Sequence, residues 1–125
     1  PGGGRMSSVS PYVAYARALD ALGWSPVEFC VAESFAERLS GMIRLPPLAP
    51  NGLPYVLAFP DCSSVHTCAM AYPLDIAFID RAGRVLQRHE RVVPWHFESC
   101  PDAWAALERA SVLEREACRC GAYAG

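Results

Sequence analysis

Apolar and polar residues alternate along several short stretches of this chain, and elsewhere the apolar residues recur with a helical period. The alternation from Val27 to Val31 predicts a strand with one face in the core. Other stretches, rich in apolar residues or bounded by them, predict extended segments at residues 55–59, 65–70, 74–79 and 85–93. Four residues, 80–83, join the last two segments, and Gly83 supplies the positive backbone angle that a short hairpin loop needs.

Helix caps and helical spacing predict three helices. The first covers residues 12–22, after a serine cap and a proline at the first helical position, and it ends at Gly23. The second begins at a capping box formed by Ser34 and Glu37 and carries an apolar stripe. The third is short and covers residues 101–109, beginning at a proline.

Two segments are predicted as loops. Residues 46–54 contain four prolines and suit a rim or lid. Residues 95–99 follow Pro94, which ends the preceding strand. Aromatic residues near these loops either frame a shallow groove for a small ligand or peptide, or close the ends of a small barrel: Tyr55, Tyr72, Trp95, His96 and Phe97.

The predicted elements indicate an α+β fold, with a small, mainly antiparallel curled sheet or half-barrel and about three short helices. The chain has 125 residues, of which 52% are hydrophobic, and this suits a single domain. Residues 1–9 are expected to be a disordered leader or cloning scar.

Charge and cysteine content narrow the classes of function. The 13 acidic and 11 basic residues give a net charge of −2 without any block of like charge, so we expect no nucleic-acid partner. No apolar run approaches the roughly 18 residues of a membrane span. No export signal follows Met6, which predicts a cytoplasmic protein. The six cysteines include no CxxC pair, and reduced thiols are favoured over a disulfide framework.

The stretch from Cys62 to Val85, CSSVHTCAMAYPLDIAFIDRAGRV, combines a polar cluster with the predicted hairpin. It resembles the signature of the domain of unknown function 192 family, which consists of small prokaryotic proteins. The matching residues are Pro60, Cys62, Val65, His66, Thr67, Met70, Pro73, Leu74, Asp75, Asp80, Gly83 and Arg84.

The resemblance implies one domain over residues 27–121, with an N-terminal helix extension at 10–26 and a tail at 122–125. The family fold is a small curled sheet or half-barrel with helices, and it ends in a hydrophobic strand that carries Leu-Glu. This implies a strand at residues 112–114, whereas helical periodicity alone favours one helix over residues 101–118. The family has no established activity.

The polar cluster suggests two kinds of chemistry. Alternate residues of an extended segment share a face, so a zinc site could begin there, with further ligands from His89, His96 or Cys100. The residues on that face are Cys62, Ser64, His66 and Cys68. In the second hypothesis Cys62 or Cys68 is a nucleophile, His66 is its base and Asp75 orients the base. The competing interpretation makes these residues ordinary packing and hydrogen-bonding groups.

Asp75 interrupts an apolar strand, and a carboxylate in that position needs a partner. Arg38 is the predicted partner, because Arg38 and Gly41 resemble the helix signature of the family. Such a pair ties the helix to the strand, or else it lines a pocket for an anionic or polar ligand.

These observations favour a non-enzymatic accessory or binding module for a protein partner or a small ligand. The predicted binding residues are Cys62, His66, Thr67, Met70, Asp75 and Arg38. We expect a monomer with no cofactor, no bound metal and no catalytic residue. The alternative is a metal-dependent or thiol-based enzyme that uses Cys62 and His66.

Overall fold

The computed structural model describes residues 10–32 and 46–111 of the chain. They form one helix and seven strands, in the order α2 (Pro11–Leu22), β1 (Glu28–Val31), β2 (Tyr55–Pro60), β3 (Ser64–His66), β4 (Leu74–Ile79), β5 (Val85–Val92), β6 (Phe97–Ser99) and β7 (Ala105–Ala110). The predicted α+β class is confirmed. Among these residues no helix combines the length and the apolar character that crossing a membrane requires.

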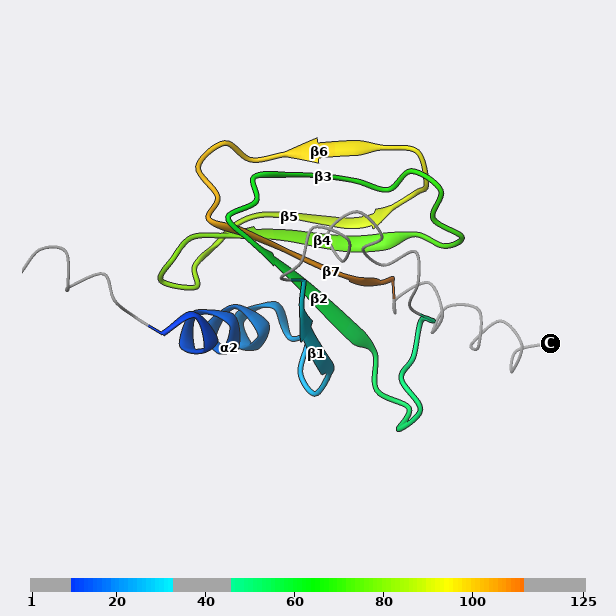
Figure 1. Cartoon of the computed structure of the whole chain (residues 1–125), viewed down its shortest axis with the longest axis horizontal. Coiled ribbons are helices and arrows are strands. Elements are labelled where there is room, and N and C mark those ends of the chain that lie inside the picture. The colour runs from blue at the N-terminus through cyan, green and yellow to red at the C-terminus, as the bar shows by residue number, and fades with distance from the viewer. Residues whose placement is uncertain (1–9, 33–45, 112–125) are drawn as a thin grey trace, which may run out of the picture.

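Five strands form a mixed, mainly antiparallel sheet in the order β1-β2-β7-β4-β5, in which β1 and β2 run parallel. Strands β3 and β6 pair antiparallel as a separate ribbon. In Figure 1 this ribbon lies at the top of the view and α2 lies below the sheet. The expected β-barrel is wrong, because within the described residues β1 and β5 end the strand order and neither sheet closes.

The central strands β2, β7 and β4 are buried on both faces of the sheet, and alternate residues of β4 face two different cores. The ribbon-side core packs Val65, Met70 and Cys100 against Leu74, Ile76 and Phe78. The helix-side core packs Tyr15, Leu19 and Trp24 against Ala77 and Ile79. A strand that is buried on both faces reads as a continuous apolar run, and this explains why the stretch 74–79 was predictable as a strand.

The first predicted helix is confirmed as α2. The Ser10 side chain accepts a hydrogen bond from the Tyr12 N–H at 3.2 Å, and Pro11 occupies the start of the helix. Gly23 ends the helix in the left-handed conformation with φ 73°, and its N–H donates to the Asp20 carbonyl at 3.1 Å. Local sequence was sufficient here because both caps are formed by residues within or next to the helix.

The third predicted helix is wrong, because most of residues 101–109 belong to strand β7, the central strand of the sheet. Ala, Leu, Glu and Arg are good helix formers, so the local propensity favours a helix. Strands β2 and β4 flank β7 and satisfy its backbone on both edges, and these long-range pairings override the propensity. Strand β7 contains a Leu-Glu pair of its own, Leu107–Glu108.

Other predictions have mixed outcomes. The hairpin of β4 and β5 is confirmed, with Gly83 at φ 89°. The predicted loop at 95–99 is wrong in part, since residues 97–99 form β6 by pairing with distant β3. The extended segment at 65–70 is shorter than predicted, because β3 ends at His66 and the Met70 N–H donates to the Thr67 carbonyl in a turn. The second predicted helix and the strand at 112–114 lie outside the described residues.

Gly83 should be the least replaceable glycine among those the structure describes. A Cβ at this position would overlap the backbone carbonyl of Ala14 in α2, in addition to the strain at φ 89°. Gly52 is the matched control, because its φ is 88° and a Cβ added there would meet no atom within 4 Å. We expect Gly52→Ala to cost about 1–2 kcal/mol of unfolding free energy from backbone strain. We expect Gly83→Ala to cost about 1–3 kcal/mol more, from the clash with α2. If chemical denaturation gives equal losses of unfolding free energy for Gly83→Ala and Gly52→Ala, the close approach of the hairpin to α2 is contradicted.

Candidate functional site

Thr67 is a buried centre of hydrogen bonding just after β3, and it is 1% exposed. Its Oγ1 donates to the Val93 carbonyl at 2.8 Å and accepts from the His96 N–H at 2.9 Å. Its backbone N–H donates to the His96 carbonyl at 2.9 Å, and its carbonyl accepts from the Trp95 N–H at 3.1 Å. Thr67 therefore holds residues 93–96 in one conformation.

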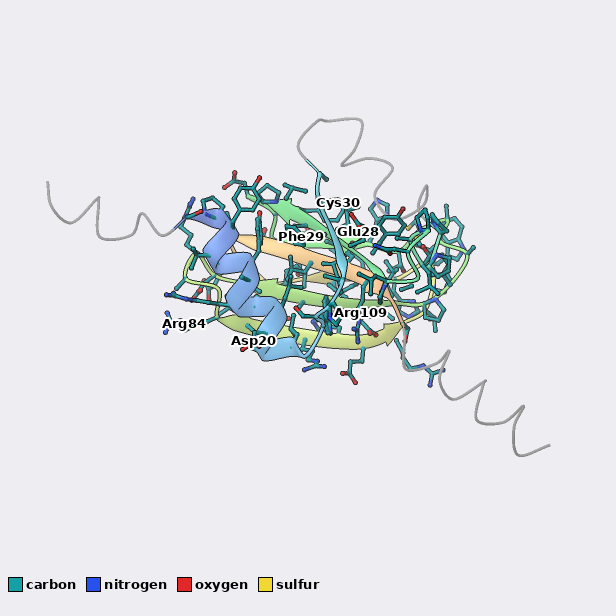
Figure 2. All side chains as sticks on the ribbon, turned by 90° about the horizontal axis from the view of Figure 1, so that it is seen from below. Asp20, Glu28, Phe29, Cys30, Arg84 and Arg109 are labelled. Carbon is teal, nitrogen blue, oxygen red and sulfur yellow. The ribbon has the colours of Figure 1, made fainter. Side chains whose placement is uncertain are left out.

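Asp75 holds Arg91, two residues before this stretch, from the other face of the sheet. It is 2% exposed, and its Oδ1 accepts from the backbone N–H of Arg91 at 3.0 Å, where the chain takes φ 57°. Its Oδ2 accepts from Arg109 Nε at 2.9 Å. The Arg109 guanidinium lies 4.5 Å from the centre of the Trp24 ring, and Figure 2 labels Arg109 on the side of the sheet that α2 covers. The expected partner Arg38 lies outside the described residues.

Residues 93–97 present large apolar side chains to solvent. Val93 is 48% exposed, Trp95 is 71% exposed and Phe97 is 67% exposed. His66 lies directly opposite Phe97 in the ribbon, and both His66 and His96 are exposed. These five residues are called the Trp95 surface below. Trp95 has φ 70°, which is uncommon for a bulky residue and persists where the surroundings impose it.

The structure divides the predicted binding residues between two faces of the sheet. Met70 belongs to the ribbon-side core and Cys62 packs against it, while His66 is exposed. Thr67 is buried beside the Trp95 surface and binds its residues Val93 and His96. Asp75 alternates with Leu74 and Ile76 along β4 and so faces the helix side, where it pairs with Arg109. Asp75 binds the backbone N–H of Arg91 and Thr67 binds the carbonyl of Val93, so the two residues hold the same strand end two residues apart.

The contacts of Cys62 and His66 do not form a thiol–imidazole pair. The Cys62 thiol donates to the Ser64 carbonyl at 3.0 Å, and His66 Nδ1 accepts from the Cys68 N–H at 3.2 Å. The four described cysteines are free: Cys30, Cys62, Cys68 and Cys100. Across residues 10–32 and 46–111, no three His, Cys, Asp or Glu side chains gather to hold a metal ion.

Glu108 is a buried acid that sequence reasoning missed. It lies in β7 between Leu57 of β2 and Ile76 of β4, and it is 4% exposed. Burial raises the pKa of Glu108 to about 8, so its carboxyl is largely protonated at neutral pH. Burial, and secondarily the charge of Glu108, raises the pKa of Tyr72 to about 12. No local signal marks Glu108, because in the predicted helix it would have been an ordinary polar position.

An open mixed sheet with a helix on one face and a two-stranded ribbon on the other defines a small α+β protein. In this protein Thr67 and Asp75 bind the backbone between residues 91 and 96. Residues 19–122 match the family model DUF192, described as Uncharacterized ACR. The chain belongs to this family, which confirms the resemblance noted in the sequence. No curated protein matches the chain.

Two crystal structures share this fold. A protein of unknown function from Novosphingobium aromaticivorans superposes with a TM-score of 0.54 at 22% identity, over 69% of this chain and 64% of that one. A protein from Sinorhizobium meliloti described as "a putative transcription regulator" superposes with a TM-score of 0.53 at 22% identity, over 73% of each chain. This chain therefore spans about two thirds of the length of the first protein, and at such identity the likeness shows the fold alone.

Proposed function

We propose that this protein is a non-enzymatic binding module that docks a protein partner through the Trp95 surface. The observation that carries the proposal is the exposure of Val93, Trp95 and Phe97 on backbone that buried Thr67 holds in place. Clustered exposed apolar side chains are a common mark of interaction sites. Aromatic residues, and Trp above all, contribute much of the binding energy at protein interfaces.

The chemistry of the surface suits an apolar protein segment. None of its five residues carries a fixed charge, and Glu98 of β6 is turned away from Phe97, toward His89, at 3.6 Å. Strand β6 has β3 as its neighbour on one edge, and no other described strand covers the second edge. An extended partner segment that adds to this edge would gain backbone hydrogen bonds beside the aromatic side chains.

The hydrogen bonds of Thr67 supply preorganisation. A surface whose backbone is already ordered loses less conformational entropy when it binds, and this increases affinity without adding contacts. Thr67 accordingly acts as a positioning residue beneath the surface, which fits its place in the family signature.

Site-specific photo-crosslinking tests the proposal. A photoreactive phenylalanine analogue is placed at position 95 or 97 in the full chain, which is then expressed in cells of the source organism and irradiated. We expect discrete crosslinked species with another protein, identifiable by mass spectrometry. The matched control is position 86, since Leu86 is also an exposed apolar residue, at 40%, but lies on β5. Identical products from positions 86 and 95, or none from 95 and 97, would refute the proposal.

Thr67→Val distinguishes specific binding by an ordered surface from nonspecific hydrophobic association. The substitution keeps the shape of the side chain and the backbone hydrogen bonds of residue 67, but it removes the two side-chain hydrogen bonds, to the Val93 carbonyl and from the His96 N–H. We expect the folded variant to lose most of the crosslinking from the photoreactive analogue at position 95, although the side chain at that position stays exposed. Analytical sedimentation of the purified chain tests whether the surface instead binds a second copy of this protein. A dimer that dissociates on Trp95→Ala would contradict the proposal of a separate partner.

A further inference from the structure

A cleft of about 400 Å³ lies on the side of the molecule that α2 covers, apart from the Trp95 surface. The first turns of α2, the ends of β1 and β2, the β4–β5 hairpin and the segment before β7 meet there. Residues that matter for its chemistry are Tyr12, Tyr15, Val31, Asp61, Arg81 and Trp104. Its volume falls within the range of small-molecule sites.

Aromatic rings form the apolar part of the cleft. Tyr15 stacks on Trp104 with ring centres 5.4 Å apart at 21°, and Tyr12 meets Tyr15 edge-on at 6.4 Å. Tyr15 is 3% exposed, and the backbone N–H of Trp104 donates to the Ile79 carbonyl at 2.8 Å, so the Tyr15 ring and the backbone that carries Trp104 are anchored in the fold. Tyr12 is 66% exposed and offers its ring to an occupant. An aromatic or flat apolar group suits such a wall.

One positive and one negative group stand at the same cleft. Arg81 Nη2 lies 3.7 Å from Asp61 Oδ1, and the two side chains are 67% and 73% exposed. The Arg81 guanidinium also lies 5.6 Å from the centre of the Trp104 ring, which directs it over the aromatic wall. Asp61 has φ 54°, and the Cys62 N–H that follows donates to the Trp104 carbonyl at 3.0 Å. A long, exposed ion pair contributes little to stability. Arg81 and Asp61 can therefore give up their mutual contact and each bind a ligand group with little loss of folding free energy.

We propose that this cleft binds a free amino acid with an aromatic side chain. Its carboxylate pairs with Arg81, its ammonium group pairs with Asp61, and its ring lies against Tyr12 and Trp104. A ligand with only one charge leaves the opposite protein charge without a new partner, whereas a zwitterion matches both. This site is separate from the Trp95 surface, and the proposal does not depend on the proposed function.

Titration of the ¹⁵N-labelled full chain with L-phenylalanine, followed by NMR, tests the proposal. The chain has three tryptophans, so three indole N–H resonances report on three places in the molecule. We expect the Trp104 indole to shift on binding, while those of Trp24 and Trp95 stay in place. N-acetyl-L-phenylalanine mimics a peptide carboxyl terminus and L-phenylalanine amide mimics an amino terminus. Each should bind about tenfold more weakly than L-phenylalanine, and L-alanine should bind more weakly still.

Two arginine variants complete the test. Arg81→Ala should weaken the binding of L-phenylalanine about tenfold and leave the amide nearly unaffected. Arg84→Ala is the control, because Arg84 is in the same hairpin and is likewise an exposed arginine paired with an aspartate, Asp80, but does not line the cleft. No shift of Trp104 up to about 10 mM ligand, or an affinity unchanged by Arg81→Ala, would overturn the proposal. Preference for the amide or the acetylated analogue would overturn it in favour of a peptide terminus.

Discussion

Replacing Asp75 with alanine should lower the free energy of unfolding by about 3–5 kcal/mol, the usual cost of removing one partner of a buried ion pair. Asp75 is 2% exposed and the Arg109 side chain is 14% exposed, so the guanidinium would be left with little water to replace the carboxylate. The backbone N–H of Arg91 would lose its acceptor as well. Chemical denaturation of the purified variant measures the loss.

Asp61→Ala is the matched control for this prediction. Asp61 also pairs with an arginine, but both side chains are mostly exposed, and we expect a loss of no more than about 1 kcal/mol. Similar losses for Asp61→Ala and Asp75→Ala would mean that the buried pair contributes no more than a surface pair. Asp75→Asn should lie between them, since an amide oxygen can still accept one hydrogen bond without carrying the charge.

Glu108→Gln should make the protein less sensitive to pH. In the folded chain burial raises the pKa of Glu108 to about 8 from its ordinary value of 4.5. Between these two values the folded state binds a proton that the unfolded state has released, so stability falls as pH rises from 4.5 through 8. The difference in unfolding free energy, Glu108→Gln minus the unsubstituted protein, should therefore grow by about 2–3 kcal/mol between about pH 5.5 and 7.5.

Glu90→Gln serves as the control for pH dependence. Glu90 is a half-exposed residue of β5 that pairs with Arg88 at 3.0 Å. The difference in unfolding free energy between Glu90→Gln and the unsubstituted protein should change little over the same pH range. Denaturation curves recorded at several pH values for the three proteins give the answer directly. Parallel curves for Glu108→Gln and the unsubstituted protein would mean that Glu108 is already ionised in the folded state.

The two acids show how the fold uses opposite solutions for a buried carboxyl group. Asp75 keeps a partner, because its position on β4 places it beside Arg109 of the neighbouring strand. Glu108 lies on the opposite face of the same pair of strands, among apolar residues, and there protonation lowers the cost of burial. Neither group contacts the Trp95 surface directly, although Asp75 fixes the backbone that leads to it.

Local sequence was sufficient to predict α2, the β4–β5 hairpin and the family. The helix caps, the turn glycine and the family signature are each contained in a short stretch of chain. The need of Asp75 for a partner also followed from its place in an apolar strand. Only the tertiary structure decided that residues 105–110 form the central strand, because strands β2 and β4, distant in sequence, satisfy its backbone. Long-range pairing likewise created β6, placed Thr67 beneath residues 93–96 and brought Asp61, Arg81 and Trp104 to one cleft. Contacts between distant segments leave no periodic trace in the sequence, and for this reason they could not be predicted from it.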